Sequence, residues 1–458
     1  MNAPVDVDVL VVGAGPTGLT LGVDLARRGV EAMVAERAGA LSPGSRGKGV
    51  QPRTQEVFDD LGVLDAIRAA GGPYPPRMIW RDGRQAGVRP MFEPVEATEG
   101  APYTEPLMVA QWRTQEVLHA RLAELGGRVA FDRELTGLAQ DPEGVTARFA
   151  DGTTVRARYA VAADGGRSAV RRAVGIGMTG ETVDPSPFLV ADVRVRGLDR
   201  EHWHTFPGED GTGLMLCPLA GTEDFQLAAR LPGGETPDLS LEGLRKLVGA
   251  ATHLGPEDLT EVRWASEFRP RAALADRFRA GRVFLAGDAA HVHSPAGGQG
   301  LNTSVQDAYN LGWKLGAVLR DGAPDALLDT YEEERRANAA AMLDLSTGVH
   351  RGEVQRGRAT VQLDLGYRAS ALSVDTRPDP AGIRAGDRAP DGTVEGVRLF
   401  DAFRGPHWTL LGAGLPGVRS LPAAYGPGVV LVRPDGYVGW AGDSAEGLGA
   451  YARRVGLA

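Results

Sequence analysis

The sequence predicts an α/β protein in which a sector that begins with a βαβ unit is split by an inserted, mostly antiparallel sheet and followed by a small C-terminal domain. Three observations predict the split sector. An apolar run, VDVDVLVV at residues 5–12, leads through a glycine-rich turn into a helix and a second strand. Short alternating strands then fill about residues 180–268. Finally the buried-type strand RVFLA, residues 282–286, returns to the first pattern, so the antiparallel layer divides the parallel-sheet domain.

The elements follow from hydrophobic periodicity and from glycine and proline breaks. The first βαβ unit has a strand at 5–12, a helix at 19–28 that Gly29 ends, and a strand at 31–36. Further helices are expected at 54–70, 111–125, 241–250, 303–319 and 326–348. Further strands are expected at 78–81, 129–138, 145–149, 155–163, 188–196, 213–219 and 225–231.

These elements group into domains. Residues 1–75, 107–179 and 269–345 are expected to form one discontinuous nucleotide-binding domain. Residues 76–106 and 180–268 are expected to form the inserted sheet domain. A helix and linker cover 346–386, and 387–458 form a small C-terminal α/β domain.

Composition excludes several classes of function. The net charge of −9, without a basic block, argues against a nucleic-acid partner or an anionic membrane surface. No stretch approaches a membrane span, and the N-terminus lacks a positive leader, so a cytoplasmic protein is expected. The single cysteine, Cys217, excludes an internal disulfide and is expected to be a buried apolar residue. Glycine is the unusual residue: its 63 copies are about twice ordinary usage.

The first glycine cluster is GAGPTG, directly after the first strand. Gly13 allows the tight turn, Gly15 lets the backbone approach a pyrophosphate, and Gly18 lets helix and strand pack closely. Pro16 and Thr17 lie within this cluster, and the N-terminus of the helix that follows it favours phosphate. Glu36 ends the second strand, where a carboxylate can accept ribose hydroxyls. The cluster predicts dinucleotide binding without separating FAD from NAD.

The second cluster lies in RVFLAGDAAHVHSPAGGQGLN, residues 282–302. Gly287 and Asp288 follow a buried strand, where a carboxylate can bind a ribityl hydroxyl. Gly297, Gly298 and Gly300 then let backbone amides lie against a flat ring at the start of the next helix. Taken alone, this stretch also fits an ordinary glycine-rich turn before a helix.

Together with AADGGRSAVRR (residues 162–172), these stretches resemble the class A flavoprotein aromatic hydroxylases, the FAD monooxygenases of the para-hydroxybenzoate, phenol and polyketide hydroxylase type. The resemblance covers about residues 5–345 and implies a split Rossmann-like FAD domain with an inserted substrate domain. It implies a set of cofactor-binding residues, and three members of this set, Arg46, Pro295 and Gly298, are also expected to have catalytic roles. The cofactor-binding set is Gly13, Gly15, Pro16, Thr17, Gly18, Glu36, Arg37, Arg46, Gln111, Arg113, Asp164, Gly165, Arg167, Gly287, Asp288, Pro295, Gly298, Gly300, Leu301 and Asn302.

The tail carries its own resemblance. APDG (389–392), RLFDAFRGPHWTLL (398–411) and VLVRPDGYVGWAG (430–442) resemble the thioredoxin-like C-terminal domain of the phenol and polyketide hydroxylase branch. It contains no cysteine, which excludes thiol redox chemistry there. A structural or dimer-supporting role is therefore expected for this domain, and in the second case the protein would be a homodimer.

The family resemblance implies a reaction. NADPH or NADH, bound transiently, reduces FAD; dioxygen then forms a flavin C4a-hydroperoxide that hydroxylates an aromatic phenolic or polyketide substrate, such as an antibiotic. Arg46 would stabilise charge in the closed site, or would only bind a phosphate. Baeyer–Villiger or ring-opening oxygenation is the alternative in the same class. A non-catalytic flavin-binding interaction protein is the alternative in another.

The substrate pocket is expected between the inserted sheet and the flavin. Apolar and aromatic side chains there would hold a planar ligand, although for any one of them a place in the core is the favoured interpretation. The candidates are Trp80, Phe92, Trp203, Phe206, Met215 and Phe225. No metal site is expected, because His291 and His293 lack a third ligand cluster.

Overall fold

A parallel sheet of apolar strands forms the centre of the first domain. In the computed structural model, which describes residues 6–92, 95–208, 212–231, 237–294, 296–380 and 382–457, strand β1 (Val7–Val12) lies between β2 (Ala32–Ala35) and β11 (Thr154–Ala162), parallel to both. β20 (Val283–Leu285) pairs in parallel with β11. The chain between β11 and β20 therefore holds the insertion that the sequence predicts.

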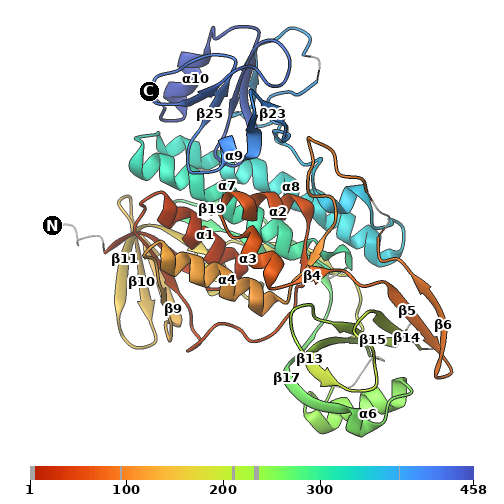
Figure 1. The fold of residues 1–458 in the computed structure, drawn as a ribbon. Coiled ribbons are helices and arrows are strands. Elements are labelled where there is room, and N and C mark those ends of the chain that lie inside the picture. Colours follow the sequence, from red (N-terminus) through yellow and green to blue (C-terminus); the bar gives the residue numbers. More distant parts are fainter. Residues whose placement is uncertain are drawn as a thin grey trace.

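Helices cover this sheet, and the two longest, α7 (Gly300–Arg320) and α8 (Asp329–Arg351), lie between the first domain and the C-terminal domain (Figure 1). α1 (Pro16–Arg27) packs against both α4 (Gln111–Glu124) and α7, and α7 packs against α8. The expectation of one helix over 54–70 is wrong. The segment forms α2 (Pro52–Asp60) and α3 (Leu64–Ala69), because Gly62, with φ at 72°, turns the chain out of the helix.

The inserted domain is a seven-stranded sheet. Its strand order is β17 (Leu259–Phe268), β13 (Phe188–Val195), β16 (Phe225–Arg230), β15 (Gly213–Pro218), β14 (Trp203–Pro207), β5 (Arg77–Arg81) and β6 (Arg84–Arg89). All neighbours are antiparallel except β14 and β5. β5 and β6 precede β11 in the chain, whereas the other five strands follow it. Two separate chain segments therefore build this sheet.

The two faces of the inserted sheet have different partners. Leu189, Leu214, Phe206 and Leu227 on one face form a hydrophobic core with Leu244 of α6 (Leu241–Ala251). Because successive side chains of a strand point to opposite faces, the residues next to these in each strand lie on the other face, which is directed toward the first domain. We call this second side the inner face.

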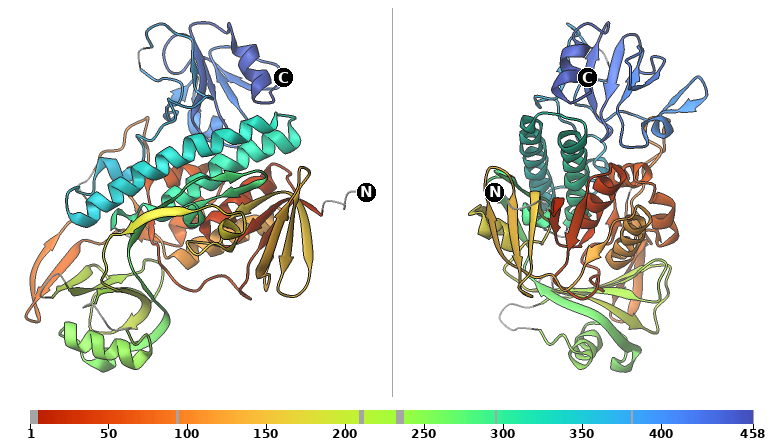
Figure 2. Two further views of the ribbon diagram at one scale, coloured as in Figure 1. Left: turned by 180° about the vertical axis from the view of Figure 1, so that it is seen from behind. Right: turned by 90° about the vertical axis from the view of Figure 1, so that its left-hand side faces the viewer.

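The C-terminal domain contains a five-stranded mixed sheet and lies at the opposite end of the molecule from the inserted sheet (Figure 2). Its strand order is β22 (Val374–Asp375), β28 (Val438–Gly442), β27 (Val429–Val432), β25 (Thr409–Leu411) and β26 (Arg419–Leu421). β22 lies in the segment expected to be linker, where it pairs with β28. Helices α9 (Leu399–Phe403) and α10 (Leu448–Arg454) complete this domain.

Shorter elements complete the fold. One small sheet joins β3 (Gly49–Val50), β7 (Leu107–Met108) and β4 (Gly72–Pro73), and another joins β12 (Met178–Thr182), β18 (Arg271–Ala275) and β21 (His291–Val292). The remaining elements are β8 (Val129–Ala130), β9 (Leu135–Gln140), β10 (Val145–Phe149), α5 (Ala169–Ala173), β19 (Arg279–Ala280), β23 (Thr393–Val394) and β24 (Val397–Arg398). Among the described residues, no helix has the length and apolar character needed to cross a membrane.

Candidate cofactor and substrate site

The predicted motifs converge on one edge of the parallel sheet. The loop from Gly13 follows β1, Glu36 follows β2, Asp164 comes after β11, and Gly287 comes after β20. Because these strands are parallel, their carboxyl ends meet at the same edge, which is where open α/β sheets bind ligands.

Glycine is required where these loops touch one another. A Cβ on Gly13, whose φ is 106°, would lie 2.4 Å from the Ala163 carbonyl oxygen, and one on Gly18 would lie 1.9 Å from the Gly13 carbonyl oxygen. Gly287 would similarly meet Thr17 Oγ1 at 2.5 Å. Gly15 is different: no atom lies within 4 Å of its Cβ position, so its backbone borders open space.

Two acidic residues hold the loops in place. Glu36 accepts hydrogen bonds from the backbone N–H of Ala14 (2.9 Å) and of Ala38 (3.0 Å), which fixes its carboxylate beside the first glycine loop. Asp164 Oδ2 accepts from the N–H of Ala169 at 2.7 Å and so caps α5, while its Oδ1 is buried without a partner. The predicted Arg37 and Arg167 are exposed beside Glu36 and Asp164, and Gly165 has no atom within 4 Å of its Cβ position.

Asp288 follows β20, and the protein around it changes the pKa of its carboxyl. Its side chain is open to solvent, yet the surrounding protein raises the pKa of its carboxyl through desolvation, while the charges of His291 and Arg46 oppose that rise. Arg46, whose charge acts on Asp288, also donates to Ser266 Oγ of the inserted sheet at 3.2 Å.

Asn302 joins the start of α7 to the segment around β3. Its side-chain oxygen accepts from Gln51 N–H at 2.8 Å, and its Nδ2 donates to the carbonyls of Gly49 (2.9 Å) and Gly298 (2.8 Å). Gly297 and Gly298 have φ values of 78° and 65°, which favour glycine. Pro295, expected on the flavin face, lies outside the described residues.

The other predicted cofactor residues lie around Gly47. Gln111 accepts the Gly47 N–H at 2.9 Å, and a Cβ on Gly47 would lie 3.2 Å from Leu301. Gly300 has ordinary contact distances to His293. Arg113 instead forms an ion pair with Glu116 at 2.9 Å on the surface of α4.

The arrangement fits a dinucleotide with a flat ring such as FAD. The backbone at Gly15 and Gly165 leaves room along the sheet edge, and an unpartnered carboxylate oxygen of Asp164 is available there. Asp288 is accessible farther along, before the glycine loop at the N-terminus of α7. Glu36, Asp164 and Asp288 would then bind hydroxyl or amine donors, and the glycines would approach phosphate and ring.

The substrate candidates divide between the two faces of the inserted sheet. Trp203 and Met215 lie on the inner face, packed with Met108 and Cys217, and Phe92 contacts Tyr74 edge-to-face at 5.2 Å. The expectation for Trp80, Phe206 and Phe225 is corrected. These side chains belong to the core that α6 covers, because strand alternation directs them away from the dinucleotide domain.

Sequence reasoning missed polar residues on this inner face. Lys48 Nζ donates to Gln226 Oε1 and lies 4.1 Å from the centre of the Trp203 ring. Gln226 in turn donates to the Ser45 carbonyl, next to Arg46. The signal was present in SRGKGV, since Lys48 is one of three lysines in the whole chain. A groove of about 590 Å³ is lined in part by Tyr74, whose ring lies 6.3 Å from that of Trp203.

Cys217 and the histidine pair have defined surroundings. Cys217 is buried as expected, and burial raises the pKa of its thiol to about 11 despite the nearby Lys48 charge. His291 Nε2 lies 2.5 Å from Asp307 Oδ2, and His293 Nε2 lies 2.9 Å from His291 Nδ1. Asp307 also accepts from Arg335 at 2.7 Å, so the histidines belong to a buried hydrogen-bonded chain.

Known proteins resemble this chain over most of its length. A family model described as FAD binding domain matches residues 6–346. A flavin-dependent monooxygenase of Mycobacteroides abscessus is 45% identical, covering 98% of this chain and 99% of that protein. A rifampicin monooxygenase of Rhodococcus hoagii is 32% identical, with 96% of each chain covered.

Solved structures agree with these sequence matches. The structure of aklavinone-11 hydroxylase with FAD and aklavinone has a TM-score of 0.83 and 30% identity, covering 99% of this chain and 100% of that one. Its fold confirms the predicted parallel sheet with antiparallel sheets, and it contains the cofactor that the sheet-edge loops fit. This chain belongs to the FAD-binding class A flavin monooxygenases related to aromatic and polyketide hydroxylases.

Proposed function

We propose that this monooxygenase uses NAD(P)H and dioxygen to hydroxylate a phenolic or polyketide aromatic compound. The observation that carries the proposal is the position of residues 44–51 between two surfaces. On one side, Asn302 ties this segment to the Gly298 loop. On the other, Ser45 and Lys48 contact the inner face of the inserted sheet. A ring held on that face would lie beside the flavin-binding loops.

Several residues have roles in this proposal. Bound FAD would supply the electron transfer from NAD(P)H and the activation of dioxygen. Glu36, Asp164 and Asp288 would hold its hydroxyl groups, and Gly298 would let the backbone approach its ring. Arg46 would place positive charge near Asp288 and the ring, while Trp203, Met215 and Phe92 would contact the substrate.

Relatives support the substrate class. Their names include rifampicin monooxygenase, aklavinone 12-hydroxylase and pentachlorophenol 4-monooxygenase, all of which act on aromatic compounds. A non-catalytic flavin-binding role is disfavoured, because the family membership is that of monooxygenases. Baeyer–Villiger oxygenation of the same ligands is the competing outcome, since the cofactor motifs do not distinguish the two products.

The experiment is a substrate screen on the purified FAD-loaded protein. NADPH and NADH oxidation and oxygen consumption are followed with naphthols, hydroxyanthraquinones, tetracyclines and rifamycins. We expect at least one aromatic compound to accelerate NAD(P)H oxidation and to gain one oxygen atom. NMR of the product then separates a new phenol from an inserted ester oxygen. If no compound is oxygenated and none stimulates NAD(P)H oxidation, the proposed function is wrong.

A further inference from the structure

Two partly buried cations contact the same side-chain cluster at the inner face of the inserted sheet. Lys48 comes from the segment before β3, and Arg356 comes from the chain after α8. Lys48 Nζ contacts Gln226 Oε1 and the Trp203 ring, whereas Arg356 Nη1 lies 3.5 Å from the Met91 sulfur. Trp203 and Met91 belong to one packed cluster, and the Arg356 charge lowers the pKa of Lys48.

Neither cation has a carboxylate partner. Within the part of the chain that the structure describes, no Asp or Glu oxygen lies within the 4.0 Å ion-pair distance of Lys48 or Arg356. Asp192 attracts Lys48 from farther away, and burial raises the pKa of Asp192 to about 6. Tyr74, the phenol near Arg356, stays neutral because burial raises the pKa of its hydroxyl, so it supplies no counter-charge.

This arrangement is unfavourable in the free protein. Burial lowers the pKa of both Lys48 and Arg356, because desolvation penalises their charged forms. A purely structural ion cluster would contain opposite charges, as around Glu334 elsewhere in the molecule. An anion bound at both cations would relieve their desolvation and their mutual repulsion.

The surrounding side chains favour a planar ligand. The rings of Tyr74 and Trp203 lie 6.3 Å apart at an interplanar angle of 26°. Met91, Met108 and Met215 pack around them, and thioethers adapt well to aromatic surfaces. Lys48 and Arg356 are thus two cations on a mainly apolar and aromatic surface that also carries the Gln226 amide and the Tyr74 hydroxyl.

We propose that Lys48 and Arg356 bind an anionic oxygen of a planar aromatic substrate and thereby determine substrate specificity. The oxygen belongs to an ionised phenol, an ionised enol or a carboxylate. This assignment deepens the proposed function and rests on it, because it takes the inner face of the sheet to be the substrate surface. Lys48 and Arg356 act here as specificity residues and carry out no chemical step.

Equilibrium binding to the oxidised FAD-loaded protein tests the assignment without turnover. The probes are anthraquinone-2-carboxylate with its neutral carboxamide, and alizarin with its neutral dimethyl ether, titrated by flavin difference spectroscopy and calorimetry. We expect the wild type to prefer each anion at least tenfold, as for a charge-assisted hydrogen bond. The carboxylate pair and the phenol pair separately identify which anionic oxygen is preferred.

Matched variants separate charge recognition from packing. Lys48→Met and Arg356→Met should each lose most of the anion preference while binding the neutral probe within about twofold of wild type, and Lys48→Arg should keep the preference. Lys246→Met and Arg358→Met are controls, since these side chains are 73% and 85% exposed. Equal binding of both probe types by the wild type, or an unchanged preference in both Met variants, would overturn the assignment.

The small number of lysines allows a direct spectroscopic readout. Protein labelled with ¹³C at lysine Cε contains three such side chains: Lys48, the fully buried Lys314 and the exposed Lys246. Addition of anthraquinone-2-carboxylate should shift the Lys48 signal and raise its titration midpoint, whereas the carboxamide should not. An unchanged Lys48 signal at saturating concentrations of both anionic probes also overturns the assignment.

Failure of the assignment differs from failure of the proposed function. If anions bind through Lys48 and Arg356 but no aromatic compound is oxygenated, hydroxylation is wrong and the anion site stands. If an aromatic compound is hydroxylated while the wild type shows no preference for anionic probes, or both Met variants keep the wild-type preference, the function stands and the site is wrong.

Discussion

Gly18 is the residue at which a single methyl group should have the largest effect on cofactor binding. Its Cβ would lie 1.9 Å from the Gly13 carbonyl oxygen, a backbone atom that cannot move without displacing the loop. Gly18→Ala should therefore weaken FAD binding by at least tenfold, so that the protein purifies largely colourless. Absorbance at 450 nm after desalting measures the retained flavin.

The control for that substitution is Gly449→Ala in α10. The nearest atom to its Cβ position is Arg453 Nη1 at 3.9 Å, so the methyl group fits, and alanine favours a helix. This variant should retain FAD as the wild type does. Full retention of FAD by Gly18→Ala would contradict the close packing described for the first glycine loop.

The raised pKa of the buried Asp192 carboxyl leads to a prediction of how the stability of the protein depends on pH. Asp192 is fully buried on β13, and desolvation, reinforced by the Asp224 charge, raises the pKa of its carboxyl to about 6. The native state then binds this proton more tightly than the unfolded chain, so its contribution to stability is lost as pH rises from about 4 to about 6. Asp192→Asn should thus stabilise the protein at pH 7.5, by up to about 3 kcal/mol, and much less at pH 4.5.

Denaturant unfolding of the wild type and of Asp192→Asn at both pH values measures this difference. Asp344→Asn, at an exposed position on α8, is the matched control and should change stability little at either pH. A destabilised Asp192→Asn variant at pH 7.5 would show that the ionised carboxylate is required for folding.

At the scale of elements, the sequence predicts the parallel sheet well and the inserted sheet less completely. Strand, glycine loop and helix around Gly13 form a local unit, so their order alone indicates the site. The inserted sheet is covered on one face by α6 and on the other by the first domain, so both faces carry apolar residues. Alternation therefore separates Trp203 from Phe206 but cannot say which of them faces the cofactor loops.

Other misses have a similar physical cause. Lys48 lies in a loop, where periodicity carries no information, and its partners Gln226 and Trp203 come from distant strands. Strand β22 has only two residues, and it is defined by pairing with β28 more than sixty positions away. Such contacts depend on the tertiary fold, which a single sequence does not display.

Asn302 is the connection between two elements, β3 and α7. Its three side-chain hydrogen bonds, at 2.8–2.9 Å, reach Gly49, Gln51 and Gly298. Asn302→Ala should destabilise the protein by about 3 kcal/mol, at about 1 kcal/mol for each bond, and should loosen the glycine loop. Chemical unfolding and FAD affinity measure the two effects.

Asn338 on α8 provides a comparison within the same pair of helices. Its side-chain nitrogen is buried without a hydrogen-bond partner, so Asn338→Ala removes no such bond and should cost little or even stabilise. Equal losses in both variants would mean that the bonds of Asn302 do not specifically support the cofactor loop.

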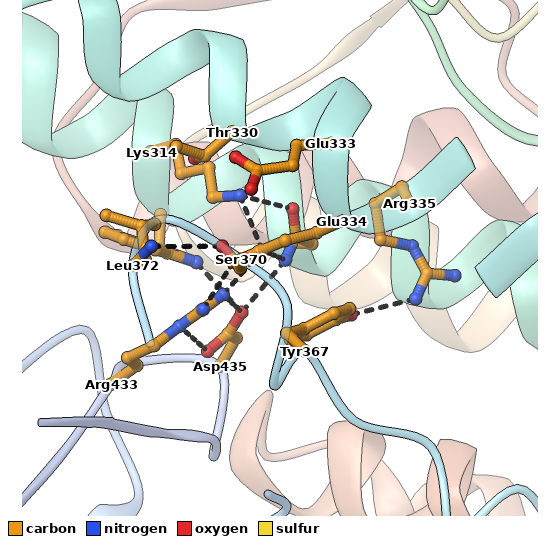
Figure 3. A network of polar contacts seen from close by, with 12 residues as sticks. Lys314, Thr330, Glu333, Glu334, Arg335, Tyr367, Ser370, Leu372, Arg433 and Asp435 are labelled. Carbon is orange, nitrogen blue, oxygen red and sulfur yellow. Dashed lines mark hydrogen bonds and ion pairs between the residues drawn. The ribbon is translucent and has the colours of Figure 1, made fainter. Parts of the chain in front are cut away.

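At the scale of the whole molecule, the C-terminal domain shares its interior with the FAD domain. Trp313 of α7 packs edge-to-face on Trp408 at 5.4 Å, within one hydrophobic cluster that also contains Leu327 and Trp440. Charged groups cross the same boundary (Figure 3): Arg433 pairs with Glu334 of α8 at 2.6 Å, and Glu334 also pairs with Lys314 at 2.7 Å. The domain is therefore part of the support for α7, the helix that begins at the cofactor loop.

This shared interior predicts that the two domains unfold together. Arg433→Met would leave Glu334 and Asp435 without their shared buried cation, and breaking such pairs typically costs about 3–5 kcal/mol. Calorimetry of the wild type should show a single unfolding transition, and FAD fluorescence should rise over the same temperature range. Arg433→Met should lower the midpoint of that transition. Arg404→Met, which breaks a pair with Asp59 on a side chain 43% exposed, should cost less than about 1 kcal/mol. Two separate transitions, with FAD released in only one of them, would instead mean that the C-terminal domain folds independently of the catalytic part.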